Sequence, residues 1–382
     1  IKAANLSPSE LLVIVEVYER WYTFVFPLFE LADRNFNDWW TNQNRDLSRV
    51  EVGLSYTHHN LRGRNESLRL LFQFGFTDRY RIAYRIPYID KKQILGIDFG
   101  AGYAENKNIP YATENHLRLF ADSEDVIGRR FGAFFGFNYR PSFYLRQSLE
   151  LGFNYEQVAD TILTLNPDFF VNGNTRQRYF NLDYKITNDL RDVAAYPLNG
   201  SYWRAFLFKA GLGIFDDVDY TILGSRYHRF FDLGSNFYYA GMVGAKAAFP
   251  QNQPYPQLNA LGYDPYTVRG YDLLVIEGPF LTIHKSAFKF KALSGKLDMR
   301  KFIPIEEFQS FPYASFIKVF FDAGYVVNYR DYEVNNRLTN KLLFGYGVGL
   351  DLFTSYDSVF RIEYALNSEG GSIFLFNIKA GI

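Results

Sequence analysis

The sequence has no cysteine, only five histidines and no net charge. Without cysteine, the chain can form neither a disulfide nor a thiolate metal site. The histidines, at positions 58, 59, 116, 228 and 284, are scattered and match no metal-ligand spacing. The 41 basic and 41 acidic residues balance, so no basic excess points to nucleic acid as a partner. We therefore expect no metal site and no nucleic-acid partner.

Long apolar runs and catalytic groupings are missing as well. No 18 consecutive residues are apolar and uncharged, so no transmembrane helix is expected. No Ser/His/Asp arrangement and no acid pair stands apart from ordinary polar residues, so an enzyme is not predicted. The first eight residues lack the charged start and apolar core of a signal peptide, which favours a chain trimmed from something longer.

Aromatic residues, by contrast, are abundant. They make up 19% of the chain, with 39 Phe and 30 Tyr, as expected where aromatic girdles lie at two membrane interfaces. Residues 1–40 differ from the rest, because Leu11–Tyr18 is a nearly continuous apolar run that fits a buried strand. We interpret residues 1–40 as the end of a small α/β module and a linker. Trp39 and Trp40 fit either a membrane interface or a hydrophobic cap.

From Ser48 onward, apolar and polar residues alternate with a period of two. In residues 143–156, for example, Phe143, Leu149 and Phe153 share one face, and Arg146 and Glu150 share the other. A soluble antiparallel sheet would show the same alternation. These segments are long, however, and a tilted membrane strand needs roughly 9–11 residues. The pattern also persists with almost no helical segment, which favours a closed membrane barrel.

Counting the alternating segments gives sixteen antiparallel strands, an even number as in bacterial single-chain barrels. We predict a barrel over residues 41–382 with strands near 48–59, 65–77, 79–90, 93–105, 112–124, 126–140, 143–157, 176–188, 200–213, 217–230, 235–248, 288–302, 314–327, 341–354, 357–367 and 372–382.

One long connection, at about residues 250–287, interrupts this pattern. Loops of this length in a compact chain are usually functional or disordered. This one is rich in proline, glycine and aromatic residues, and the aromatics favour a packed loop. Its centre carries the stretch Val268-Arg-Gly-Tyr271.

Strand parity indicates what Arg269 could contact. Alternation directs Lys318, Phe320, Asp322 and Gly324 into the lumen from strand 314–327, and Ser294, Lys296, Asp298 and Arg300 from strand 288–302. If the loop folds inward, Arg269 can pair with Asp322 and Asp298, and such a pair can be bidentate. Gly270 would permit a close backbone approach. The alternative is a solvated surface loop whose arginine pairs with nothing.

These motifs resemble those of the BamA-type superfamily of outer-membrane assembly and translocation barrels, the bacterial surface antigen barrels. Val268-Arg-Gly-Tyr271, before the twelfth strand, looks like the family's loop motif. Seven further stretches resemble family features: Phe320-Phe-Asp-Ala-Gly324 and Gly295-Lys-Leu-Asp-Met-Arg300 (strand motifs), Gly345–Leu350 with Phe360–Ala365 (last strands), Asp189–Asp192 (mid-barrel hairpin), residues 9–40 (the end of a polypeptide-transport-associated, or POTRA, domain) and Glu30–Asn37 (similar to Bacteroidetes homologues).

The resemblance implies a bacterial outer-membrane protein that folds proteins into the membrane or moves them across it, without a cofactor. Its implied partners are outer-membrane lipid and lipopolysaccharide, unfolded client proteins, and accessory lipoproteins or other complex subunits. The implied latch consists of Val268, Arg269, Gly270 and Tyr271, held on the barrel wall by Phe320, Asp322, Gly324 and Asp298. The terminal stretch Asn377–Ile382 departs from the family, because it lacks the usual aromatic end.

A barrel built from these strands must close strand 48–59 against strand 372–382. The predicted seam residues are Val52, Gly53, Leu54, Phe374, Phe376 and Ile378. Short or irregular pairing there would leave backbone groups free to template a strand from a client protein. The alternatives are a fully paired seam, movement of one soluble partner through the lumen, and a passive or structural barrel within a larger complex.

Overall fold

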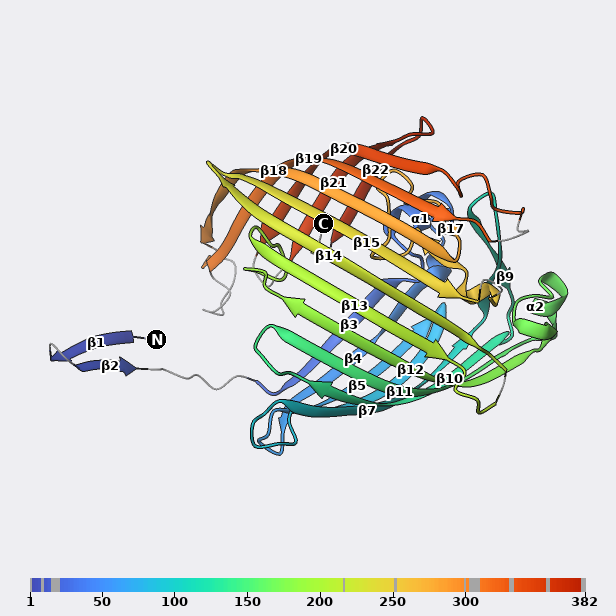
Figure 1. Ribbon diagram of the computed structural model, residues 1–382, viewed down its shortest axis with the longest axis horizontal. Helices are drawn as coiled ribbons and strands as arrows, with labels where there is room; N and C mark the ends of the chain where they lie inside the picture. Colours follow the sequence, from blue (N-terminus) through green and yellow to red (C-terminus); the bar gives the residue numbers. More distant parts are fainter. Residues whose placement is uncertain are drawn as a thin grey trace.

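Sixteen antiparallel strands form one continuous sheet that curves into a barrel in the computed structural model (Figure 1). The structure describes residues 2–7, 10–14, 21–215, 217–250, 253–298, 300–301, 310–329, 333–354 and 358–378. Within these residues, no helix is long and apolar enough to cross a membrane. The predicted all-β class and the number of strands in the sheet are confirmed.

The barrel strands follow one another in sequence order around the sheet. They are β3 (Thr23–Leu31), β4 (Val50–Leu61), β5 (Glu66–Gly75), β6 (Thr77–Ile86), β7 (Leu95–Asn106), β10 (Gly128–Tyr139), β11 (Leu145–Val158), β12 (Arg176–Asp189), β13 (Gly200–Ala210), β14 (Tyr220–Gly234), β15 (Phe237–Phe249), β18 (Phe280–Asp298), β19 (Ser310–Val327), β20 (Leu342–Thr354), β21 (Val359–Asn367) and β22 (Ser372–Ile378).

The remaining elements lie outside this sheet. Three two-stranded sheets pair β1 (Lys2–Ser7) with β2 (Glu10–Ile14), β8 (Asn108–Glu114) with β9 (Leu117–Asp122), and β16 (Asn259–Leu261) with β17 (Ile276–Glu277). The helices are short: α1 (Phe36–Thr41), α2 (Asp160–Leu165) and the 3₁₀ turns Leu47–Arg49, Val171–Gly173 and Tyr255–Gln257.

The two faces of the sheet differ in the way expected of a membrane barrel. Phe288, Val319 and Val348 are paired across three neighbouring strands and are each more than half exposed. The adjacent positions Lys289 and Lys318 are also paired with each other, yet both are buried. Apolar side chains outside and charged side chains inside reverse the pattern of a soluble sheet. Lipid therefore suits the outer face, and the lumen holds the charges.

Long connections gather at one end of the barrel, which we call the loop end. Because the strands alternate in direction, the connections 32–49, 107–127, 159–175, 211–219, 250–279 and 328–341 all lie there. Figure 1 shows α1, α2, β9 and β17 clustered at that end. Buried residues of several of these connections pack together, as Ile109, Ile162 and Phe170 do. The loop end is therefore covered by packed chain.

Three predicted boundaries are wrong. Residues 23–31 form barrel strand β3, although they were assigned to the module and linker of residues 1–40, so the barrel begins at Thr23. Residues 112–124 contribute no barrel strand, because β8 and β9 pair only with each other. The two errors cancel in the count of sixteen. The long loop is also shorter than predicted, because β18 begins at Phe280.

Candidate functional site

Arg269 lies at the centre of the long loop and is clamped against the inner wall of the barrel. Its Nε donates to Oδ2 of Asp322 at 2.8 Å and its Nη2 to Oδ1 at 2.5 Å, a bidentate pair. Its backbone N–H also donates to Asp322, and its guanidinium lies 3.8 Å from the centroid of the Phe320 ring. Arg269 and Asp322 are both buried. The loop is therefore folded inward. Strand parity predicts the pairing with Asp322, and the resemblance implies Phe320 as a further wall residue.

The second carboxylate partner is Glu363 rather than Asp298. Nη1 of Arg269 donates to Oε1 of Glu363 at 2.9 Å, from strand β21. Asp298 instead pairs with Arg300 and is exposed. It lies thirteen residues beyond Lys285, the residue on the same strand that faces Asp322, which is roughly 40 Å at 3.3 Å per residue. Strand parity predicts the face of the sheet on which Asp298 lies, but not its position along the barrel axis.

The inner face of β18–β21, which we call the latch wall, continues this pairing away from Arg269. Lys318 Nζ lies 3.0 Å from Glu363 and 2.6 Å from Asp351, and Arg361 Nε lies 3.1 Å from Asp351. Lys285 Nζ lies 3.8 Å from Asp322. Every acid of this network therefore contacts two cations, which compensates charges that would be costly to bury alone.

The network also reaches the opposite end of the barrel. The connection between β12 and β13, residues 190–199, carries Tyr196, whose hydroxyl donates to Oδ2 of Asp351 at 2.8 Å. The Tyr196 ring packs on Phe316, with ring centroids 4.8 Å apart. The latch wall thus holds the long loop from one end of the barrel and the connection 190–199 from the other end.

Burial and neighbouring charges shift the pKa values of Arg269 and Asp272 in the long loop. Burial alone would lower the pKa of Arg269, but Asp322 and Glu363 outweigh it and raise the pKa above its usual value. Burial raises the pKa of Asp272 to about 6, opposed by the backbone N–H of Gly270 that donates to its carboxylate at 2.9 Å. The latch arginine thus stays charged at any physiological pH.

Glycines at the contact let the loop backbone approach the latch wall closely. At Gly345 of β20, a Cβ atom would lie 1.8 Å from the carbonyl oxygen of Arg269, so only glycine fits. Gly270 has φ of +94°, and its carbonyl accepts from Nδ2 of Asn367 at 2.7 Å. A backbone this close to the wall requires glycine on both partners.

The flanking latch residues are buried in the same contact. Val268 packs against Gly324, where a Cβ would lie 2.6 Å from its Cγ2 atom. The Tyr271 hydroxyl lies 2.9 Å from Oγ of Ser368, between β21 and β22. Sequence parity and the loop motif therefore identified Gly270, Tyr271, Val268 and Gly324 as residues that the structure brings together with Arg269.

A second grip on the long loop comes from residues 32–49, which sequence reasoning assigned in large part to a linker. Arg34 Nη1 donates to the carbonyl oxygens of Gly262 at 2.7 Å and Leu274 at 3.1 Å. Asn35 and Asn42 donate to neighbouring carbonyls of the same loop. No sequence signal marked these contacts, because their acceptors are backbone groups.

Helix α1, in the same connection, lies against the last strand. The Phe36 ring packs with Trp39 and Trp40, at centroid separations of 5.7 and 5.5 Å. It also contacts Phe376 of β22 edge-on at 6.1 Å. The two tryptophans thus belong to an aromatic cluster beside β22, as in the capping alternative.

The ends of the sheet are β3 and β22, so the seam differs from the predicted one. Strand β4 lies between β3 and β5, which places Val52, Gly53 and Leu54 away from the seam. On the other side, Phe374, Phe376 and Ile378 do lie on edge strand β22. Among the described residues, no ladder joins β22 to β3.

The free edge of β3 contains a proline. Backbone bonds from Ala32 to Arg49 and from His59 to Tyr22 fix the ladder between β3 and β4. Hydrogen-bonded and non-bonded pairs alternate in such a ladder, and Pro27 lies five residues from each of these bonded positions. Its nitrogen therefore points away from β4, toward the seam. The edge lacks a donor at that point.

Comparison with known proteins identifies the fold. No protein-family model matches the sequence, and no curated protein matches it. BamA from Haemophilus ducreyi lacking POTRA domains 1–3 superimposes with a TM-score of 0.63 at 15% identity, over 98% of this chain and 73% of that one. CdiB from Escherichia coli gives 0.57 at 8% identity, over 100% and 65%, and CdiB from Acinetobacter baumannii gives 0.51 at 13%, over 87% and 56%. The chain therefore has the barrel fold of BamA and CdiB, which fits an integral outer-membrane protein.

Proposed function

We propose that this barrel inserts client proteins into the outer membrane by accepting a client strand at the seam between β3 and β22. The observation that carries the proposal is the pair of sheet ends, since no ladder joins them in the described part of the chain. The fold likeness to BamA supports the same class of function.

Unpaired strand edges provide the physical driving force. Backbone N–H and C=O groups without partners are costly in hydrocarbon, where no water can bond them. An incoming strand that pairs with such an edge satisfies these groups by β-augmentation. Pro27 leaves a gap in the donors of β3, which weakens direct pairing of β3 with β22. A client strand can then compete with direct pairing between β3 and β22.

The latched loop favours the lateral route over the central one. The long loop packs on the barrel interior through Leu261, Val268 and Tyr271, which belong to one buried cluster with residues of the barrel strands. The ion pairs of Arg269 and the grip of Arg34 hold it from two sides. A client that enters at the seam does not require this loop to leave.

The likeness to CdiB supports a second candidate, movement of a soluble partner through the lumen. This route requires the long loop to leave the latch wall. The two candidates therefore differ in which contact must open.

Engineered disulfides separate the two candidates, and the chain has no native cysteine to interfere. The seam is locked by cysteine at Val25 or Phe29 combined with cysteine at Phe374 or Phe376. The loop is locked by Val268→Cys with Gly324→Cys, which face each other. Leu207→Cys with Leu223→Cys, directly paired within β13 and β14, is the matched control.

We expect the seam lock to block client insertion into liposomes until a reductant is added, while the control and the loop lock leave insertion intact. Loss of activity in the loop-locked protein alone would instead support the lumen route. Full insertion with a quantitatively locked seam would refute the proposal.

A further inference from the structure

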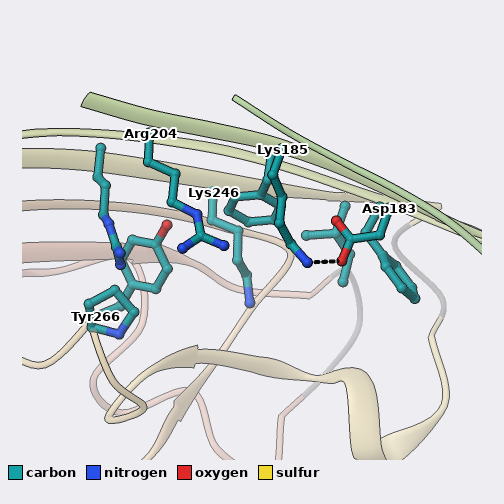
Figure 2. Close-up of a pocket in the computed structure, with 10 residues that line it drawn as sticks. Asp183, Lys185, Arg204, Lys246 and Tyr266 are labelled. Atoms are coloured by element: carbon teal, nitrogen blue, oxygen red, sulfur yellow. Dashed lines mark ion pairs between the residues drawn. The ribbon is translucent and has the colours of Figure 1, made fainter. Parts of the chain in front are cut away.

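A cavity of about 460 Å³ lies between the long loop and the inner face of β12–β15, which we call the basic wall. Pro265 and Tyr266 of the loop form one side. Figure 2 shows the side chains of Arg204, Lys185 and Lys246 extending from the strands, with Lys185 joined to Asp183. Arg269 does not line this cavity.

The charges that line the cavity are unbalanced. Four cations, Lys185, Arg204, Arg226 and Lys246, come from four successive strands, and Asp183 is the only acid among the lining residues. Asp183 already forms an ion pair with Lys185. Within the described residues, no ion pair involves any of the other three cations. Arg204, Arg226 and Lys246 therefore have no acidic partner in the described chain, and Lys246 Nζ donates to the carbonyl oxygen of Asn259.

Two of these cations face each other directly. Arg204 of β13 and Arg226 of β14 are register partners, so their side chains leave the sheet on the same face. Like charges directly opposite each other are destabilising. The Nε atom of Arg226 is also buried without a hydrogen-bond partner, and a buried donor left unpaired in a native structure requires an explanation. An anion in the cavity supplies both missing interactions.

Apolar residues complete the cavity. Phe206, Phe208 and Ile222 line it beside the cations, with Pro265 and Tyr266 opposite. A volume of this size lies within the range of small-molecule sites, roughly 300–1,000 Å³, and exceeds what a bare inorganic anion fills. The lining matches a ligand with an anionic head and an apolar body.

We propose that this cavity binds an organic phosphate. A phosphate group carries a charge of about −1.5 to −2 at neutral pH and offers three acceptor oxygens. Adjacent guanidinium groups present planar forks that bind such oxygens in pairs. Arg204 and Arg226 bind the phosphate, Lys185 and Lys246 add charge at its sides, and the aromatic residues contact the body. The phosphate comes either from a water-soluble ester or from a lipid headgroup, and both present this chemistry. Phosphate binding here does not rest on the function proposed for the seam.

The test uses the whole chain purified in a maltoside detergent, which contains no phosphate. Isothermal titration calorimetry with phenyl phosphate is expected to give one site, with weaker binding of inorganic phosphate and none of benzyl alcohol. Native mass spectrometry of the same sample identifies the source. A retained phosphorylated lipid indicates the headgroup, and its absence together with phenyl phosphate binding indicates a soluble ester.

The variant Arg204→Gln/Arg226→Gln is expected to lower the affinity for phenyl phosphate by about tenfold or more, because it removes charge-assisted hydrogen bonds. Arg204→Lys/Arg226→Lys keeps the charge and is expected to retain part of the binding, which excludes misfolding as the cause. Arg129→Gln removes the same charge from β10, outside the cavity, and is the matched control.

Absence of saturable binding of phenyl phosphate to the wild-type barrel, in a sample that retains no phosphorylated lipid, would overturn the proposal. So would equal affinity in the double glutamine variant, which would locate the anion elsewhere. Equal binding of inorganic and phenyl phosphate would overturn the role of the apolar lining.

Discussion

The latch wall and the basic wall present two solutions to the same problem, lysines and arginines that face the lumen. On the latch wall, Lys318 and Arg361 share Asp351, and Arg269 lies between Asp322 and Glu363. On the basic wall, Arg204 and Arg226 face each other, and the described chain provides neither with an acid. Charges satisfied within the chain fix structure, whereas charges left unsatisfied are available to a ligand.

The long loop touches both walls with residues only three positions apart. Arg269 is clamped to the latch wall. Tyr266 lies against the basic wall, where a Cβ atom at Gly244 would lie 3.4 Å from its ring. One contact is ionic and bidentate, and the other consists of packing around a cavity. We expect the first contact to hold the loop and the second to yield.

The largest effect is expected when the latch wall loses one member of its central pair. Asp322→Ala leaves Arg269 buried with Glu363 as its remaining ion-pair partner, and breaking a buried pair in this way costs about 3–5 kcal/mol. Thermal unfolding and protease cleavage of the long loop measure the effect. The double variant Arg269→Met/Asp322→Leu removes both charges and is expected to cost less, and a larger loss in the double variant would contradict this account.

An intermediate effect is expected when the contact of Arg34 with the long loop is removed. Arg34→Ala deletes three hydrogen bonds from a charged donor to loop carbonyls and is expected to cost about 1–3 kcal/mol of loop docking. Limited proteolysis of residues 250–279 measures it. Arg45→Ala, an exposed arginine of the same connection that lies over the Trp40 ring, is the control. Equal protease sensitivity of the two variants would show that Arg34 contributes nothing specific.

The smallest effect is expected on the basic wall, with the opposite sign. Arg226→Gln removes a like charge directly across from Arg204, so the ligand-free barrel is expected to gain about 0.2–1 kcal/mol. Thermal unfolding in phosphate-free detergent measures the gain. A loss of stability would show that Arg226 is matched within the chain and would remove the contrast between the walls.

The sequence allowed us to predict which side chains face the lumen. It told little about their position along the barrel axis or about their neighbours on other strands. A period of two directs Phe320, Asp322 and Gly324 inward whatever the register, so those predictions agree with the structure. The same parity also directed Asp298 inward, although it lies near the far end of β18. Height along a strand depends on register and on the start of each strand, which alternation does not encode.

Partners distant in sequence could not be found in this way. Glu363 meets Arg269 from a strand 94 positions away, and nothing in its neighbours marks that contact. The opposition of Arg204 and Arg226 likewise becomes visible only with the register of β13 and β14. Strand β3 was missed because apolar residues lie on both of its faces, as in the run from Phe24 to Phe26, so no alternation is visible there.

Two sheet ends without a mutual ladder, in the part of the chain described, also make the circumference of the barrel adjustable. Each strand added at the seam lengthens the perimeter by the spacing of one strand, about 4.8 Å perpendicular to its axis, and widens a tilted barrel by about 2 Å in diameter. The long loop spans part of that diameter while it is clamped to the latch wall. Growth at the seam would therefore move the basic wall away from Tyr266, which stays with the clamped loop. The cavity between them would become larger.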